Sequence, residues 1–149
     1  MIDWILRGGE VVDGSGRPRR LGDVAIAGDR IAEIGSVAKT VGAREIDVAG
    51  KIVAPGFIDV HTHDDRALFA TPDMAAKASQ GVTTVVTGNC GISLAPLVLD
   101  RVPPPPLDLL GDTADYRYAS FADYFAALDR APALNAACLV GHSTLGSGR

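Results

Sequence analysis

Two histidines, His61 and His63, stand on either side of one threonine at the end of an apolar stretch, residues 52–60. Side chains alternate along a β-strand, so a strand through these residues places both imidazoles on one side and Thr62 on the other. Two imidazoles at this spacing can chelate one metal ion. The near-continuous apolar run before them is typical of a strand buried on both faces, as in a parallel sheet. We therefore predict that the histidine pair (His61 and His63) begins a metal site, rather than being two hydrogen-bonded core histidines.

A cysteine, Cys90, follows the next predicted strand, residues 82–87. A thiolate is a strong ligand for zinc. Gly88 and Gly91 allow the backbone to turn sharply and bring the thiol close to a ligand. A free cysteine is more often a small buried hydrophobic residue, so spacing alone leaves both roles open for Cys90. Cys138 lies within a strand among alanines and is predicted to be a core residue.

Three more polar residues follow predicted strand ends. Asp64 and Asp65 come directly after the histidine pair, and they are either partners that orient an imidazole or exposed loop carboxylates. His142 follows a third predicted strand, residues 136–140. It is either a hydrogen-bond partner of the metal site or of a substrate, or an imidazole on a surface loop. Asp65 and His142 are thus candidates for substrate binding or for support of the metal ligands.

The elements that must position these residues alternate in type after Gly50. Thr71 and Pro72 are typical of a helix start and Gly81 of its end. Apolar residues at helical spacing follow a potential cap at Ser120. The predicted order is strand 52–60, helix 71–81, strand 82–87, a long connection at 92–119, a helix from 120, and strand 136–140. This is an α/β pattern, the start of a (β/α)8 TIM-like barrel with about three strand–helix units.

Residues 1–50 have a different pattern. Val24, Ile26, Ile31 and Ile34 alternate around a turn at Gly28, which indicates a β-hairpin. We predict a small antiparallel β module over residues 1–50 and an incomplete barrel over residues 51–149. A full barrel takes about 250 residues, so the 149-residue chain is expected to be a fragment. Its open sheet edge would favour self-association.

Composition excludes several classes of function. The net charge of −4 offers no basic stripe for nucleic acid. No apolar run approaches the roughly 20 residues of a membrane span, and no signal peptide is visible. Two cysteines form no disulfide framework. These features predict a cytoplasmic protein that binds neither nucleic acid nor membrane.

Two stretches resemble a known enzyme family. APGFIDVHTH (residues 54–63) resembles the first barrel strand of the amidohydrolase superfamily. The more selective run QGVTTVVTGNCGISLAPL (residues 80–97) resembles the N-acyl-D-amino-acid deacylase (D-aminoacylase) branch, as does GHSTL (residues 141–145). The resemblance covers nearly the whole chain. It implies that His61, His63 and Cys90 are metal ligands for one or two zinc ions, in a barrel beside a β module built from both chain ends. It also implies that further metal-binding histidines and a catalytic aspartate lie beyond Arg149.

The reaction implied by this resemblance is hydrolysis of the amide bond of a small molecule, an N-acyl-D-amino acid, to a carboxylate and a D-amino acid. One alternative is a hydantoinase or dihydroorotase type of amidohydrolase, which acts on cyclic amides. Such enzymes share the histidine pair but bridge two metals with a carboxylated lysine, for which Lys51 and Lys77 are badly placed. Another alternative is a non-catalytic metal-binding fragment. Because the aspartate is expected elsewhere, this chain alone is predicted to be inactive.

Overall fold

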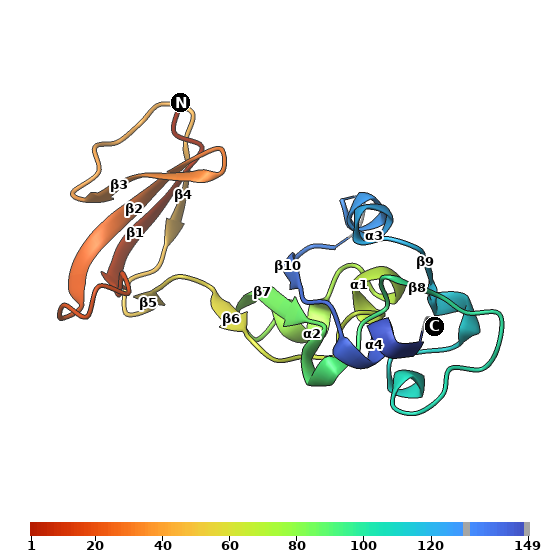
Figure 1. The fold of residues 1–149 in the computed structure, drawn as a ribbon. Coiled ribbons are helices and arrows are strands. Elements are labelled where there is room, and N and C mark those ends of the chain that lie inside the picture. The colour runs from red at the N-terminus through yellow and green to blue at the C-terminus, as the bar shows by residue number, and fades with distance from the viewer. Residues whose placement is uncertain (130–131, 148–149) are drawn as a thin grey trace. The chain divides into compact units, whose positions relative to one another are not determined.

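The computed structural model describes residues 1–129 and 132–147 of the chain. Figure 1 shows the order of the elements along it. The chain divides into two compact units, Met1–Pro55 and Gly56–Arg149, and each is described by itself. Within the described residues, no helix is both long and apolar enough to cross a bilayer.

The first unit is a five-stranded sheet with a small apolar core of Ile5, Ala25 and Val37. Its strand order is β3-β2-β1-β4, and β5 also pairs with β1. β2 and β3 form an antiparallel hairpin with Val24 opposite Ile34, as the apolar alternation indicated. The strands are β1 (Trp4–Val11), β2 (Arg20–Ala27), β3 (Arg30–Gly35), β4 (Arg44–Asp47) and β5 (Ile52–Val53).

The sheet of the first unit is mixed, which corrects the prediction of a wholly antiparallel module. β1 pairs with β2, and β2 with β3, in antiparallel fashion, but β4 and β5 both run parallel to β1. The chain leaves β3 at one edge of the sheet and returns as β4 at the opposite edge. Apolar alternation identifies the side chains that share a face but carries no information on strand direction. The parallel pairs therefore could not be read from the pattern.

Arg7 joins three strands of this unit. Its guanidinium donates hydrogen bonds to Asp23 on β2 (2.7 Å) and to Glu45 on β4 (2.6 Å). Asp23 also accepts a hydrogen bond from the backbone N–H of Gly8 (2.9 Å). The Gly8 N–H and then Arg7 hold the pKa of Asp23 below its usual range. Asp23 is therefore fixed as a carboxylate at the centre of the sheet.

The single strand predicted over residues 52–60 is divided in two. Its beginning is β5 in the first unit, whereas β6 (Phe57–Asp59) belongs to the sheet of the second unit. Pro55 lies between them and has no N–H to donate to a continuous ladder. Phe57 and Ile58 are 66% and 61% exposed, so β6 is not buried on both faces as expected. In this chain β6 is an edge strand, and no further strand covers it within the described residues.

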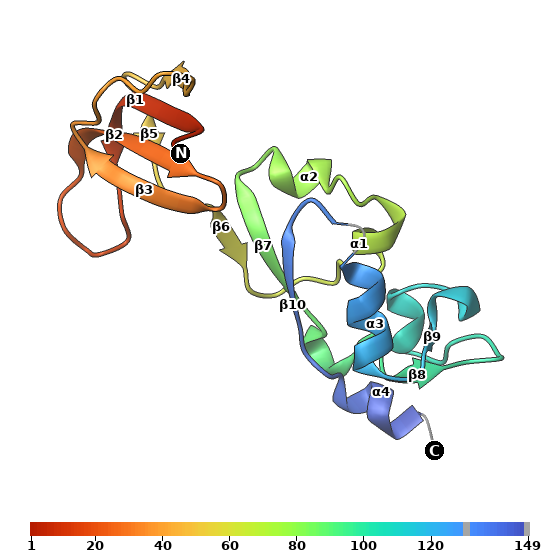
Figure 2. The same cartoon turned by 90° about the horizontal axis from the view of Figure 1, so that it is seen from above.

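The second unit alternates strands and helices around a parallel sheet of order β10-β7-β6. In Figure 2, α3 lies between β10 and the β8–β9 pair. The remaining strands are β7 (Val82–Thr87), β8 (Leu97–Val98), β9 (Arg117–Tyr118) and β10 (Asn135–Cys138). The α-helices are α1 (Ala67–Ala70), α2 (Ala75–Ala78), α3 (Phe121–Leu128) and α4 (His142–Ser147), and the short 3-10 helices are η1 (Asn89–Gly91), η2 (Leu107–Leu109) and η3 (Thr113–Asp115).

The helix predicted between Thr71 and Gly81 is reduced to the single-turn helix α2, and the other single-turn helix, α1, ends before Thr71. Thr71 ends α1 because its backbone is not helical (φ −137°, ψ 66°); its backbone N–H and its hydroxyl both donate to the carbonyl of Ala67 (2.9 and 3.2 Å). Met74 then adopts a positive φ of 47°, which interrupts helical geometry before α2. The helix predicted at Ser120 is present as α3, with the Ser120 hydroxyl accepting from the N–H of Asp123 (3.1 Å).

The long connection at residues 92–119 supplies much of the core of the second unit. Ile92, Leu94, Leu107 and Tyr116 are each at most 2% exposed and pack in one cluster with Tyr124 of α3. The antiparallel β8–β9 pair lies within the same connection. This packing fixes the loops that follow β6 and β7, where the polar residues of interest lie.

Candidate metal centre

Parallel pairing of β6 and β7 brings two separate polar segments to one edge of the sheet. The carboxyl ends of parallel strands meet at the same edge, which is where α/β folds bind ligands. The chain leaves β6 at Asp59 and passes directly into the histidine pair. The N–H of Thr62 donates to the carbonyl of Val86 (3.3 Å), so this segment stays alongside β7. Cys90, in η1 just after β7, lies at the same edge.

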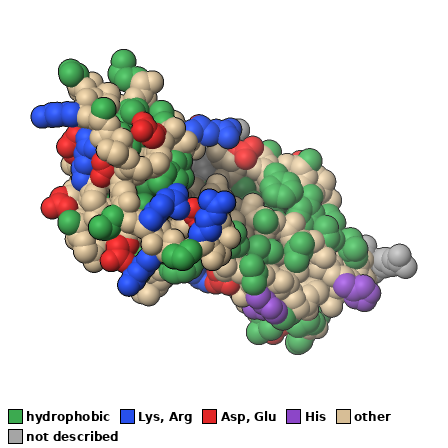
Figure 3. Space-filling model, turned by 90° about the vertical axis from the view of Figure 1, so that its left-hand side faces the viewer, with side chains coloured by type: hydrophobic (Ala, Val, Ile, Leu, Met, Phe, Trp, Pro, Cys, Tyr) green, Lys and Arg blue, Asp and Glu red, His purple; other side chains and the backbone are tan. Residues whose placement is uncertain are grey.

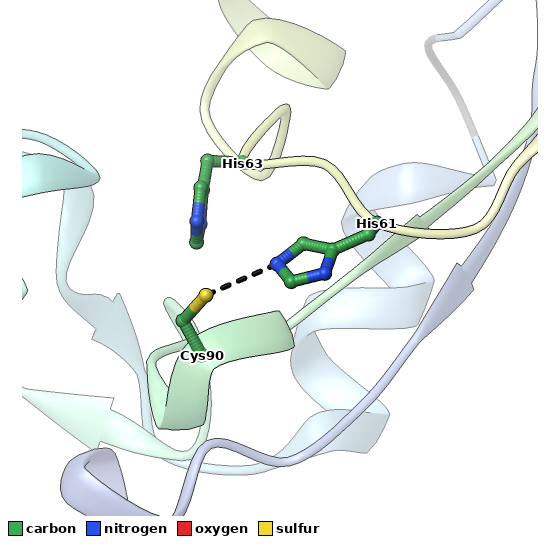
Figure 4. Close-up of side chains that lie close together, drawn as sticks. All are labelled: His61, His63 and Cys90. Atoms are coloured by element: carbon green, nitrogen blue, oxygen red, sulfur yellow. Dashed lines mark hydrogen bonds between the residues drawn. The ribbon is translucent and has the colours of Figure 1, made fainter.

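The side chains of His61, His63 and Cys90 converge, as Figure 4 shows. One ligand atom from each lies within 4.8 Å of the other two, and we call these residues the ligand cluster. The Nε2 atom of His61 is 3.0 Å from the Sγ atom of Cys90. The two imidazole rings are 5.9 Å apart between centroids and inclined at 74°. The structure therefore brings together the three residues that the sequence singled out.

The donors of the ligand cluster fit a zinc ion. Zinc holds imidazole nitrogen at about 2.0–2.1 Å and thiolate sulfur at about 2.3 Å, so ligand atoms around one ion lie about 3.5 Å apart. In the ligand cluster the His61 Nε2 and Cys90 Sγ atoms are 3.0 Å apart, and all three ligand atoms lie within 4.8 Å of one another. Two nitrogens and one sulfur suit zinc better than magnesium or calcium, which prefer oxygen. All three side chains are exposed, and histidine side chains reach the surface in Figure 3.

The backbone around Cys90 is bent to present the thiol. Cys90 has a positive φ of 56°, and so do its neighbours Gly88 (77°) and Gly91 (78°). This conformation is unfavourable for a residue with a side chain and is concentrated at functional sites. The Asn89 side chain steadies the turn by donating to the carbonyl of Val86 (2.7 Å). Because the Cys90 thiol is exposed, it is not a core side chain.

The other cysteine lies in a different environment. Cys138, at the end of β10, is partly buried and packs against the core of the second unit. Burial raises the pKa of its thiol, which favours the neutral, unreactive form.

Asp64 and Asp65 follow the histidine pair but differ in their surroundings. Asp65 is 1% exposed, and its Oδ2 atom has no hydrogen-bond partner within the described residues. Burial raises the pKa of Asp65 to about 6. Asp64 is half-buried and accepts a hydrogen bond from the Thr62 hydroxyl (2.6 Å). Neither carboxylate has a hydrogen bond to an imidazole of the histidine pair in the part of the chain that the structure describes.

His142 is the first residue of α4 and is exposed. It lies beside the turn that carries Cys90, since a Cβ atom built on Gly91 would be 4.0 Å from the Cβ atom of His142. It is not a member of the ligand cluster. The buried Thr144 fastens α4 by accepting from the N–H of Ser93 (2.8 Å) and donating to its carbonyl (3.0 Å). Sequence reasoning missed this pair, although both residues lie in the stretches that carry the family resemblance.

Sequence reasoning also missed a set of residues that we call the lysine network: Lys77, Asp59, Thr62 and Asp64. Lys77 was considered only as a metal-bridging residue. The hydrogen bond to Asp59, ahead of that to Asp64, raises the pKa of Lys77, and Lys77 in turn lowers the pKa of Asp59. The network lies next to the histidine pair, and its lysine lies on α2.

A pocket of about 420 Å³ opens beside His63. Its polar lining includes Arg66, which forms an ion pair with Asp115 (3.2 Å), and also Asp108 and Asp112. The pocket has room for a small molecule adjacent to one member of the ligand cluster.

Comparison with known proteins identifies relatives over nearly the whole chain. D-aminoacylase of Alcaligenes xylosoxydans xylosoxydans is 57% identical over 145 residues, which are 97% of this chain and 30% of that enzyme. Solved D-aminoacylase structures, one from a study of its binuclear metal centre, match with a TM-score of 0.93 and 58% identity over 99% of this chain and 31% of theirs. N-acyl-D-glutamate deacylase of Bordetella bronchiseptica, solved with zinc and a phosphonate inhibitor, matches with a TM-score of 0.91 and 47% identity over the same shares.

These matches confirm the resemblance to the N-acyl-D-amino-acid deacylases and the α/β class of the fold. The chain spans about 30% of the length of the relatives it matches. The model of the amidohydrolase family matches residues 44–147, which include the whole ligand cluster. This chain belongs to the amidohydrolase family.

Proposed function

We propose that this chain supplies metal ligands to a zinc-dependent hydrolase that cleaves the amide bond of N-acyl-D-amino acids, giving a carboxylate and a D-amino acid. The observation that carries the proposal is the convergence of the ligand cluster in a chain 57% identical to D-aminoacylase. The exposed cluster and the adjacent pocket also suit a small-molecule substrate.

In this proposal His61, His63 and Cys90 hold the zinc. Bound zinc polarises a carbonyl and lowers the pKa of water, which is the chemistry that amide hydrolysis needs. The Cys90 thiol must lose its proton to act as a ligand, because the thiolate is the form that binds zinc.

We assign supporting roles to Asp65 and His142. The carboxyl group of Asp65 is buried directly after the histidine pair and faces the backbone N–H groups of Gly88 and Leu94, on either side of the Cys90 turn, which it would support. His142 lies beside the Cys90 turn and is exposed, which suits a hydrogen bond to the substrate. The residue that transfers the proton is not assigned to this chain.

The hydantoinase or dihydroorotase alternative needs a lysine that carries a carboxylate between two metals. Carboxylation requires a neutral amine, but Lys77 is bound by two carboxylates that raise its pKa. Lys51 lies in the first unit, outside the unit that contains the ligand cluster. These observations favour the deacylase.

We further propose that the second unit begins a (β/α)8 barrel and that the first unit is a separate β module, with the boundary moved from residue 50 to Pro55 because β5 pairs with β1. Three parallel strands, each followed by a helix, support this division. The exposed apolar side chains of β6 and of the residues just after β6 and β10 also support it, because later strands and helices would cover them: Phe57, Ile58, Val60, Leu139 and Val140.

The test is turnover of N-acetyl-D-methionine with zinc supplied, with the L enantiomer as the matched control. A full-length protein that contains this sequence should hydrolyse the D substrate and leave the L substrate. The 149-residue chain alone should show no useful turnover, because general acid–base help is worth about 10²–10⁴-fold. Equal rates for both enantiomers, or for the two lengths of protein, would contradict the proposal.

A further inference from the structure

Lys77 on α2 binds the segment that carries the histidine pair at three points. Its Nζ atom lies 2.5 Å from Asp59 Oδ2, 3.0 Å from Asp64 Oδ2 and 3.2 Å from Thr62 Oγ1. An ammonium group has three N–H donors, and these three oxygens account for all of them. The lysine therefore fastens positions on both sides of His61.

The lysine network is closed by two further hydrogen bonds. The Oδ1 atom of Asp59 accepts from the N–H of His61 (3.2 Å), and the Thr62 hydroxyl donates to Asp64 Oδ2 (2.6 Å). Thr62 is 8% exposed, whereas His61 and His63 are exposed. The network thus holds the side of the segment opposite to the imidazoles.

The other hydrogen bonds to this segment in the part of the chain that the structure describes use its backbone: the Asn89 side chain donates to the carbonyl of Val60 (3.5 Å), and the N–H of Leu68 donates to the carbonyl of Asp64 (3.0 Å). After β6 ends at Asp59, residues 60–64 form neither strand nor helix. The Thr62 N–H makes one backbone hydrogen bond to β7. Without the ammonium group, Asp59 and Asp64 would be two like charges close together and would repel each other. The segment would then move, and the imidazoles with it.

We infer that Lys77 is a positioning residue of the metal centre, which keeps the histidine pair in place by binding Asp59 and Asp64. This inference rests on the metal site proposed above. The network carries two carboxylates and one ammonium group, so its formal net charge is −1, which also favours a cation nearby.

The experiment measures the affinity of the full chain for cobalt(II), a spectroscopic substitute for zinc. Absorbance from cobalt–thiolate charge transfer reports on Cys90 directly. Lys77→Met removes all three donors while keeping an unbranched stem that is only one atom shorter, and should weaken cobalt binding by about 10–100-fold, the usual cost of losing a partner that orients metal ligands. Lys77→Arg should restore most of the affinity. Lys51→Met, which removes an exposed lysine of the first unit, is the control and should bind like the unchanged protein.

Asp59→Asn serves as a second variant if Lys77→Met does not fold, as judged by circular dichroism. It keeps the size of the side chain but removes the charge that Lys77 binds, and should also weaken cobalt binding. If the unchanged protein binds no cobalt through a thiolate, the metal site itself is wrong. If it binds cobalt and a folded Lys77→Met or Asp59→Asn variant binds equally tightly, the role of Lys77 alone is wrong.

Discussion

The Nε2 atom of His61 lies 3.0 Å from the Sγ atom of Cys90, although 29 positions separate the two residues in the sequence. The contact depends on the parallel pairing of β6 and β7, which brings their carboxyl ends to one edge of the sheet. It also depends on the left-handed backbone of Cys90, which aims the thiol at the imidazole. The metal site proposed at these two residues therefore depends on the pairing of β6 and β7 and on the conformation of the turn at Cys90.

Cys90→Ala should abolish tight zinc binding. It removes the only sulfur of the ligand cluster, so the loss should exceed the roughly 10–100-fold expected for a residue that only orients ligands. Cys138→Ala is the matched control, because Cys138 packs against the core and should leave zinc affinity unchanged. Equilibrium competition with a chromophoric chelator measures both. Equal affinities for the two variants would show that Cys90 is not a ligand.

Asp23→Asn should destabilise the first unit by about 1 kcal/mol at pH 7, through loss of a charged hydrogen bond. The pKa of Asp23 is lowered on folding, so its contribution is present above the unfolded pKa, near 4, and is lost as pH falls through the folded pKa. The difference in the free energy of unfolding between Asp23→Asn and the unchanged protein should therefore become smaller as the pH falls from 5 to strongly acidic values. Thermal unfolding across this range measures it. Asp29→Asn, at an exposed turn, should have little effect at any pH. A difference that stays constant with pH would rule out the charge as the cause.

Thr144→Val should destabilise the second unit by about 1–3 kcal/mol. The valine side chain has nearly the same volume as threonine, but it leaves the buried N–H and carbonyl of Ser93 without their hydrogen-bond partner. Thr83→Val, at an exposed position of β7, should change stability by less than about 0.5 kcal/mol. Chemical denaturation of both variants gives the comparison. Similar midpoints would mean that the Ser93–Thr144 pair does not stabilise α4.

Ile58→Lys should reduce self-association of the 149-residue chain. Ile58 is 61% exposed on the edge strand β6, where a charge opposes edge-to-edge pairing. Val41→Lys is the control, since Val41 is 97% exposed but lies in a turn of the first unit, outside any strand. Sedimentation velocity at several concentrations measures the size of the species. An equal shift toward monomer in both variants would point to net charge rather than to the strand edge.

The sequence by itself determined the features that depend on neighbouring residues. Because a single residue separates His61 from His63, both side chains lie on the same side of their segment. The cap at Ser120 and the apolar residues at helical spacing after it located α3. Alternation between Val24 and Ile34 located the hairpin of the first unit. In each case the physical cause is local: the period of the backbone or a hydrogen bond within one turn.

Only the tertiary structure decided the features that depend on distant pairing. It divided the strand at Pro55, set β4 and β5 parallel to β1, and left Asp65 buried. It also brought Lys77 from α2 to the segment of the histidine pair and Cys90 to His61. These outcomes follow from which strands lie side by side and from what covers each surface. Residue types and local spacing do not specify them, because the contacts join residues far apart in the chain.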